Sequence, residues 1–360
     1  MTLELQGVTK QVRGEMHIRD ASLTLEPGTL NVLLGPTLSG KTSLLRLMAG
    51  LDRPTEGRVL WQGRDVTGLD VRHRNVAMVY QQFINYPTLS VYENIASPLR
   101  VAGAPQAEIE RKVEEVARLL RLEAMLDRTP LELSGGQQQR TAIARALAKG
   151  AGLVLFDEPL ANLDYKLREE LRSELPRLFE GSQAIFVYAT AEPSEALLLG
   201  GNTATLHQGA ITQYGPTIEL YRHPNTLRTA QVFSDPPMNE VRLAKRGASL
   251  ALPDGETLPA TGPCAGLADG DYVVGFRPNH LFLDRVDGGG LPLRARVAVA
   301  EITGSESFVH VDCAGGRWVA LAHGVRRLEV DSQIEVWLDP TRFFVFRPDG
   351  ALVLAPAAMA

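Results

Sequence analysis

Eight consecutive residues have the types and spacing of a phosphate-binding loop. The run reads G-P-T-L-S-G-K-T and fits the pattern G-x-x-x-x-G-K-[ST]. In such a loop the backbone N–H groups surround phosphate, the lysine reaches the β- and γ-phosphates, and the last hydroxyl binds Mg²⁺. We therefore predict that nucleotide binds at Gly35, Pro36, Thr37, Leu38, Ser39, Gly40, Lys41 and Thr42.

Leu38 departs from the usual wording of these loops, many of which carry glycine at this position. A leucine reaches a positive φ only at an energetic cost, because its Cβ crowds the backbone. We therefore expect Leu38 to adopt a negative φ, and its presence is a caution about the loop that does not exclude nucleotide binding.

The residues that flank the loop predict the elements that must position it. The run T-L-N-V-L-L over 29–34 is typical of a buried parallel strand. The run from Ser43 to Met48 begins a helix that Gly50 can end. A strand, a glycine loop and a helix bring several N–H groups and a helix N-terminus to one anion. A coincidental glycine-rich turn is the alternative, and the two flanks argue against it.

Two adjacent carboxylates follow another apolar run. Residues 153–156 read L-V-L-F, and Asp157-Glu158-Pro159 comes next. The carboxyl end of a parallel strand is where such sheets bind ligands. Asp157 can hold Mg²⁺ through water, and Glu158 can orient or deprotonate a water molecule. The alternative is an acidic turn at the end of a strand, but the phosphate loop upstream favours the functional interpretation.

A third apolar run, V-A-M-V-Y-Q-Q over 76–82, predicts a buried strand that ends in glutamines. The amide of Gln81 could bind a ligand at this strand end. Termination of the strand at the surface explains the same residues equally well.

The segment L-S-G-G-Q-Q-Q-R over 133–140 predicts the start of a helix. Ser134 and Gln137 have the spacing of a capping box, so the helix should begin at Ser134. Gly135 and Gly136 allow close approach to its positive end, and its first turn carries no acidic residue. An anion site is one interpretation of this pattern, and an ordinary capped helix is the other.

Composition excludes several classes of protein. The 360 residues are 44% hydrophobic and 22% charged with a net charge of −5, which gives no electrostatic reason to bind nucleic acid. Cys264 and Cys313 are too few for a disulfide framework or a zinc site, and we expect them to be core residues. We find neither a secretory signal nor an apolar run long enough to span a bilayer.

The order of the remaining patterns predicts two domains. Alternating apolar residues over 1–34 predict an antiparallel β layer, and an amphipathic helix over 105–122 belongs to a helical insertion at about 85–150. After 235 the chain becomes short strands separated by turns. The predicted fold class is an α/β P-loop ATPase domain over 1–235, followed by a small all-β, OB-like domain over 236–360.

Taken together, these motifs resemble the ATP-binding subunits of ABC transporters. The resemblance rests on the phosphate loop, Gln81, the L-S-G-G-Q run, D-E-P at 157–159 and N-L-D at 162–164, in that order. Two runs in the C-terminal part resemble the TOBE-type regulatory domain of carbohydrate importers of the maltose and glycerol-3-phosphate type. They read V-G-F-R-P-N-H-L and E-I-T-G-S-E-S-F-V-H-V. The wording P-T-L-S-G-K-T-S-L and Q-Q-F-I-N-Y-P is most similar to glycerol importers that use two different ATPase subunits.

The resemblance implies ATP and Mg²⁺ as ligands and ATP hydrolysis as the activity. It implies catalytic roles for Glu158 and Gln81, and Mg²⁺ contacts from Thr42, Gln81 and Asp157. It also implies a head-to-tail dimer, in which the ATP of one chain meets the following residues of the other: Ser134, Gly135, Gly136 and Gln137.

The resemblance further implies partners and a location. Two transmembrane permease subunits would dock around residues 83–92, and a solute-binding protein outside the membrane would act indirectly. The chain would lie on the cytoplasmic face of the inner (plasma) membrane as a peripheral subunit, with no nucleic acid partner. The resemblance leaves the transported solute open, with glycerol-like polyols favoured.

Two positions depart from the family pattern. The histidine that the family carries after its fourth core strand is replaced by Ala191, which cannot bond a phosphate. The aromatic residue on which the family stacks adenine is replaced by Val12. We therefore expect an asymmetric heterodimer, in which this chain's own site hydrolyses ATP poorly. The alternatives are a regulatory ATP-binding module and a soluble ABC ATPase without a transporter.

Overall fold

The computed structural model describes residues 2–82, 84–161, 165–179, 181–285 and 290–356. The chain divides into two compact units, Met1–Thr217 and Ile218–Ala360, and each is described here by itself. No helix in the described ranges is long and apolar enough to cross a membrane.

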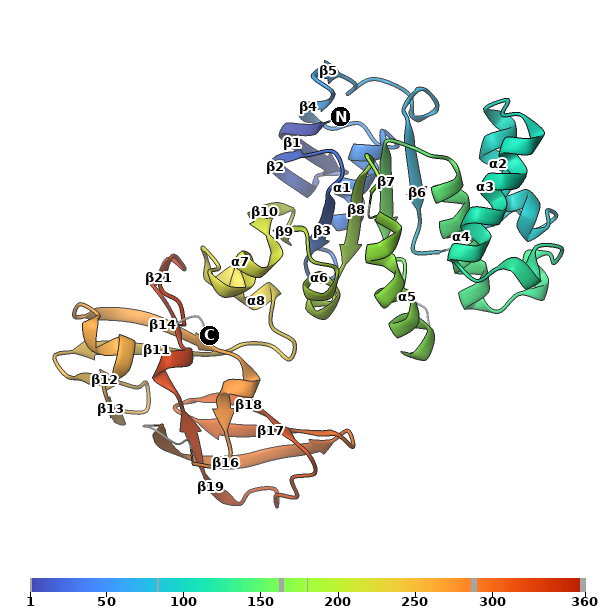
Figure 1. The fold of residues 1–360 in the computed structure, drawn as a ribbon. Coiled ribbons are helices and arrows are strands. Elements are labelled where there is room, and N and C mark those ends of the chain that lie inside the picture. The colour runs from blue at the N-terminus through green and yellow to red at the C-terminus, as the bar shows by residue number, and fades with distance from the viewer. Residues whose placement is uncertain (1, 83, 162–164, 180, 286–289, 357–360) are drawn as a thin grey trace. The chain divides into compact units, whose positions relative to one another are not determined.

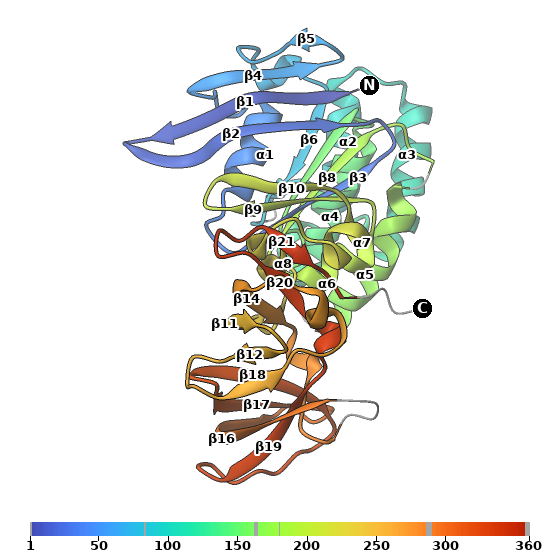
Figure 2. The same cartoon turned by 90° about the vertical axis from the view of Figure 1, so that its left-hand side faces the viewer.

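The first unit opens with the predicted antiparallel β layer. Its strands lie side by side in the order β2, β1, β4, β5 (Figure 2). Alternate side chains such as Leu3, Leu5 and Ile18 are fully buried, as expected for a sheet with one face on the core. The bounds are Leu3–Val12 for β1, Glu15–Leu25 for β2, Glu56–Trp61 for β4 and Arg64–Asp65 for β5.

A mostly parallel sheet forms the centre of the first unit, in the order β10, β9, β3, β8, β7, β6 (Figure 1). Strands β3, β8, β7 and β6 are mutually parallel, so their carboxyl ends share one edge. Strand β9 pairs parallel with β3 and antiparallel with β10, with which it forms a hairpin. The bounds are Leu30–Leu34 for β3, Val76–Val79 for β6, Leu153–Asp157 for β7, Ile185–Thr190 for β8, Asn202–His207 for β9 and Ala210–Pro216 for β10.

Helices complete the first unit, and α2, α3 and α4 form a separate group beside β6 (Figure 1). The predicted apolar face of α3 is buried at Ile109, Val113 and Val116. The bounds are Lys41–Ala49 for α1, Val91–Val101 for α2, Gln106–Leu119 for α3, Gly135–Ala148 for α4, Tyr165–Phe179 for α5, Pro193–Leu199 for α6 and Thr217–Arg222 for α7.

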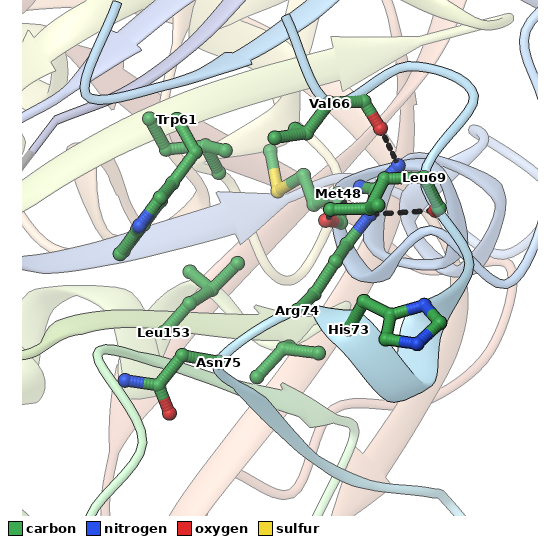
Figure 3. A pocket seen from close by; sticks show the side chains of 10 residues that line it. Met48, Trp61, Val66, Leu69, His73, Arg74, Asn75 and Leu153 are labelled. Atoms are coloured by element: carbon green, nitrogen blue, oxygen red, sulfur yellow. Dashed lines mark hydrogen bonds between the residues drawn. The ribbon is translucent and has the colours of Figure 1, made fainter. Parts of the chain in front are cut away.

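The carboxyl end of α1 is closed by two residues that fit together. Gly50 has φ +76 and ends the helix, as its position in the sequence predicts. The guanidinium of Arg74 donates to the carbonyl of Met48 at 3.2 Å, to that of Leu69 at 3.1 Å and to that of Val66 (Figure 3). The bond to Met48 satisfies a carbonyl that the last helical turn leaves without a partner, and the other two bonds tie the segment at Val66 and Leu69 to the end of the helix. We call Gly50 and the guanidinium of Arg74 the plug of α1, and a small apolar cavity of about 170 Å³ lies beside it.

The second unit contains short helices and two antiparallel sheets around one core. Phe276 and Trp318 meet edge to face in that core at 5.1 Å. Both cysteines are free and buried, which confirms that Cys264 and Cys313 are core residues. This mostly β architecture confirms the predicted fold class of the C-terminal part.

In the second unit, one sheet follows the order β13, β12, β11, β14, β20, β21 and the other follows β15, β19, β16, β17, β18. The helix bounds are Leu227–Val232 for α8, after the shared helix α7. The strand bounds are Asn239–Arg246 for β11, Ser249–Ala251 for β12, Thr257–Pro259 for β13, Gly270–Phe276 for β14, Leu281–Phe282 for β15, Leu291–Ile302 for β16, Glu306–Cys313 for β17, Gly316–His323 for β18, Gln333–Leu338 for β19, Phe344–Phe346 for β20 and Leu352–Leu354 for β21.

Candidate nucleotide site

The predicted site residues of the first unit follow the carboxyl ends of neighbouring parallel strands. The phosphate loop leaves β3, Asp157 ends β7, and Gln81 comes two residues after β6. Backbone bonds tie these ends together, because the N–H of Gly35 donates to Thr190 and that of Glu158 donates to Ala189. The sheet order therefore brings groups that are far apart in the sequence to one edge.

Lys41 is the buried cation of this edge, with 5% of its surface exposed. Its Nζ donates to the carbonyls of Gly35 at 2.7 Å and Pro36 at 3.1 Å. It also lies 3.2 Å from Oε1 of Glu158. Lys41 is thus held inside its own loop and neutralised by a carboxylate, in a position to meet a phosphate.

Glycines shape the loop around this lysine. A Cβ on Gly35 would lie 2.5 Å from the carbonyl of Leu206, so no other residue fits there. Gly40 has φ +105, and a Cβ on it would lie 2.8 Å from the carbonyl of His17. The hydroxyl of Ser39 is buried and has no hydrogen-bond partner among the described residues. An unpaired buried hydroxyl beside such a cradle fits a bound phosphate group.

The expectation for Leu38 is wrong, because its φ is +66. The loop must reverse direction at this point, and the leucine accepts a left-handed conformation that costs about 1 kcal/mol. Its side chain is 95% exposed, so no packing within the described residues offsets this cost.

The acidic side of the site begins with a pair on the loop helix and β7. The hydroxyl of Thr42 donates to Oδ1 of Asp157 at 3.0 Å. Burial raises the pKa of Asp157, the hydrogen bond from Thr42 lowers it, and the charge of Glu158 raises it further. A carboxylate kept in a partly dry site beside a hydroxyl offers the hard oxygen donors that Mg²⁺ prefers.

Glu158 connects the two sides of the site. Its Oε1 faces Lys41, and its Oε2 accepts from Nε2 of Gln81 at 3.2 Å. The backbone of Glu158 has φ +45, a strained conformation that turns it out of the direction of β7. The structure therefore brings together five residues that the sequence singled out: Lys41, Thr42, Gln81, Asp157 and Glu158.

Four of these residues, Lys41, Thr42, Gln81 and Glu158, line a cavity of about 790 Å³. Its lining also contains six residues that were not predicted as site residues: Glu15, Met16, His17 and Arg19 of β2, Ser43 of α1, and Gln208 of the β9–β10 turn. One sequence signal could have pointed to His17. Its imidazole nitrogens can form hydrogen bonds, and it stands next to Ile18 in a predicted strand of alternating polar and apolar residues. The approach of β2 to the loop, however, is a tertiary feature with no local signal.

The predicted anion site at α4 lies elsewhere in the first unit. Ser134 caps this helix with the expected reciprocal bonds, because the N–H of Gln137 donates to its Oγ at 3.4 Å. Gly135 and Gly136 form the first turn, and Gly135 is exposed. None of these residues is among the described residues that line the loop cavity. The capped start of the helix is confirmed, and its role toward an anion stays a prediction.

The structure places both residues that depart from the expected ATPase pattern, Ala191 and Val12. Ala191 directly follows β8 and is exposed, so it contributes no polar side chain to the shared edge. Val12 ends β1 opposite Glu15 and is not among the described residues that line the cavity. Phe83 and residues 162–164, which the sequence analysis also singled out, lie outside the described residues.

Comparison with known proteins identifies the family. Residues 18–161 match the family described as ABC transporter, and residues 274–346 match the TOBE domain. The sn-glycerol-3-phosphate import ATP-binding protein UgpC of Salmonella typhimurium is 37% identical over 333 residues, covering 90% of this chain and 92% of its own. The protein of that name from Rhizobium meliloti is 38% identical, covering 93% and 95%. This chain belongs to the family of ABC transporter ATP-binding subunits.

Solved structures agree with this assignment. The ATP-binding cassette MJ0796, solved as a dimer in a post-hydrolysis state bound to ADP and Pi, is 30% identical with a TM-score of 0.55. The match covers 60% of this chain and 98% of the cassette. This ABC subunit is therefore an ATP hydrolase, and its P-loop fold and C-terminal TOBE domain are those that the sequence predicts.

Proposed function

We propose that this ABC subunit drives the import of a carbohydrate or glycerol-like polyol. Its relatives are named for sn-glycerol-3-phosphate import, and the TOBE match lies where the sequence resembles carbohydrate importers. The observation that carries the proposal is the joined cluster of Lys41, Glu158, Gln81, Thr42 and Asp157. We retain 1–235 as the nucleotide-binding domain and 236–360 as the regulatory β domain.

The site residues then have distinct roles. Lys41 and the N–H groups of the loop hold the phosphates, and Lys41 exchanges its bond to Glu158 for bonds to phosphate oxygens. Thr42, Gln81 and Asp157 would hold Mg²⁺, which would neutralise phosphate charge when bound. Release from Lys41 leaves the Glu158 carboxylate free to accept a proton from the attacking water, while the hydrogen bond from Gln81 fixes the orientation of the carboxylate.

We infer that the working unit is an asymmetric heterodimer. Ser134, Gly135, Gly136 and Gln137 sit apart from this chain's loop, as expected if they contact a partner's ATP. Ala191 and Val12 weaken this chain's own site but leave that contribution intact. The dimer would bind two permease subunits at the cytoplasmic face of the inner membrane and receive solute from an extracytoplasmic binding protein.

The test is the ATPase rate of the assembled transporter purified in detergent. Glu158→Gln in this chain should lower the rate less than about threefold, whereas the equivalent change in the second ATPase should lower it more than about tenfold. The unchanged transporter and a Lys41→Ala variant are the controls. Equal losses from the two glutamine variants would contradict the proposed asymmetry between the two ATPase subunits. Failure to recover two membrane proteins with this chain would contradict its proposed role in an importer.

A second candidate is a regulatory ATP-binding module, which the loss of the histidine at Ala191 favours. In that case ATP would bind to this chain but the assembly would hydrolyse it only at the partner. Glu158→Gln would then leave the rate unchanged. A soluble ABC ATPase without a transporter predicts recovery in complexes that contain no membrane protein.

A further inference from the structure

The cavity beside the phosphate loop has a second lining that the phosphate chemistry does not use. One part of the lining carries the loop, Lys41, Gln81 and Glu158. The other part comes from β2 and the β9–β10 turn, with Met16 and His17 among its residues. A nucleotide whose phosphates lie at Lys41 must place its sugar and base against surface that remains.

His17 is fixed directly against the loop. Its Nδ1 lies 3.3 Å from the hydroxyl of Ser43 in the first turn of α1. Its backbone carbonyl packs on Gly40 and Gly209, where an added Cβ would lie 2.8 Å and 2.6 Å away. The imidazole is therefore held next to the site, and replacing either glycine would push β2 away.

Hydrogen bonds extend this attachment along β2. The N–H of Gly209 donates to the carbonyl of Ser39 at 2.9 Å, and the N–H of Arg19 donates to the carbonyl of Gly209 at 2.9 Å. The Nε of Arg19 donates to the carbonyl of Gln208 at 3.2 Å. The loop, the β9–β10 turn and β2 thus form one connected wall of the cavity.

The position expected to carry an aromatic residue lies outside this wall. Val12 is 37% exposed at the end of the β1–β2 hairpin. It lines no part of the cavity within the described residues. A branched aliphatic side chain also offers little to the flat face of a purine, in contrast to an imidazole ring or a thioether.

We propose that His17 and Met16 form the base-contacting surface of the nucleotide site in this chain, in place of residue 12. The planar imidazole packs on one face of the base, and the polarisable Met16 side chain, which is partly exposed, covers its edge. This inference rests on the proposed binding of ATP at the loop. If it holds, the side chains of β2 make the site prefer a nucleotide to a simple polyphosphate.

Titration calorimetry on the full chain with two probes, MgATP and magnesium tripolyphosphate, separates base contacts from phosphate contacts. His17→Ala should raise the Kd for MgATP about tenfold and leave the Kd for tripolyphosphate within about twofold. Met16→Ala should act in the same direction but less strongly, about threefold. His17→Phe keeps a flat ring without the Ser43 bond, and it should retain most of the affinity for MgATP.

Three results would overturn the base surface. One is an unchanged MgATP affinity in both the His17→Ala and Met16→Ala variants. Another is an equal loss for the two probes in His17→Ala, which would mean that the ring only supports the loop through Ser43. The third is a loss in the control variant Val12→Ala as large as that in His17→Ala. Lys41→Ala should weaken binding of both probes about a thousandfold, and an unchanged chain that binds neither contradicts ATP binding itself.

Discussion

Two buried cations, Lys41 in the first unit and Arg277 in the second, lie in different kinds of environment. In the first unit, Lys41 contacts two carbonyls of its own loop and the carboxylate of Glu158, and it faces a cavity. In the second unit, Arg277 lies 3.6 Å from the ring centre of Tyr221 and 5.0 Å from that of Phe344. Arg277 also donates to the carbonyl of Tyr221 at 2.7 Å.

The difference teaches how to separate a functional buried charge from a structural one. The carboxylate beside Lys41 can be exchanged for a phosphate, because the same donors then bind another anion. No anion can take the place of the rings around Arg277. Burial lowers the pKa of this arginine, as expected for a charge that has no carboxylate partner within the described residues. Removing Lys41 should therefore affect binding, and removing Arg277 should affect folding.

The largest effect is expected from Lys41→Ala. The variant should weaken MgATP about a thousandfold, equivalent to ~4 kcal/mol, because the phosphates lose their buried cation. Its thermal stability without nucleotide should change by less than about 1 kcal/mol, since Glu158 is partly exposed and can be solvated. Calorimetric binding and thermal unfolding of the full chain measure the two quantities, and a large loss of stability with intact binding would reverse the comparison.

Arg277→Ala should act in the opposite way. It removes a cation held between two rings and leaves the Tyr221 carbonyl without its donor, at a cost of about 3 kcal/mol in the free energy of unfolding. Affinity for MgATP should stay within about twofold. The matched control is Arg285→Ala, an exposed arginine 5.8 Å from the ring of Trp337, which should cost less than about 0.5 kcal/mol.

A second buried group near Arg277, His280, should also affect folding, and its effect should appear as a pH dependence of stability. Burial first, and then the charges of Arg277 and Arg342, lower the pKa of His280 from 6.5 to about 4, against the opposing charge of Asp339. The unfolded chain binds this proton more readily, so stability should fall by about 2 kcal/mol as pH drops from 7 through 6.5 toward 4. Denaturant unfolding at several pH values measures this slope. His280→Gln should make it shallower, and an unchanged slope would contradict the assignment.

The smallest effect is expected at Asp157. Because burial raises the pKa of this carboxyl, the folded state disfavours its charged form. Asp157→Asn should therefore stabilise the nucleotide-free chain by about 1 kcal/mol at pH 7 while it weakens the dependence of ATP binding on Mg²⁺. The gain should shrink as pH falls through the raised pKa and the wild-type carboxyl takes up its proton. A gain that persists in acid would point to packing instead.

Local spacing predicted the parts of the site that depend on neighbours in sequence. The loop around Lys41, the end of α1 at Gly50 and the capping box of Ser134 and Gln137 all depend on groups a few residues apart. The buried strands were equally readable, because a parallel sheet covered on both faces leaves continuous apolar runs.

Tertiary packing decided what the sequence could not show. The pairing of Lys41 with Glu158 requires β3 and β7 to flank β8, and no local pattern gives that order. The wall at His17 depends on β2 packing against Gly40 of the loop and Gly209 of the β9–β10 turn. Leu38 adopted a conformation that its own propensity disfavours, because the path of the loop between β3 and α1 outweighs about 1 kcal/mol.

The plug at the end of α1 constrains how this protein can vary. An added Cβ at Gly50 would lie 2.3 Å from the guanidinium of Arg74, and the φ of +76 disfavours any side chain there. Shortening Arg74 removes that obstacle but leaves carbonyls such as that of Met48 without a donor. A side chain at position 50 should therefore cost less free energy of unfolding in a chain whose Arg74 is already shortened than in the unchanged chain.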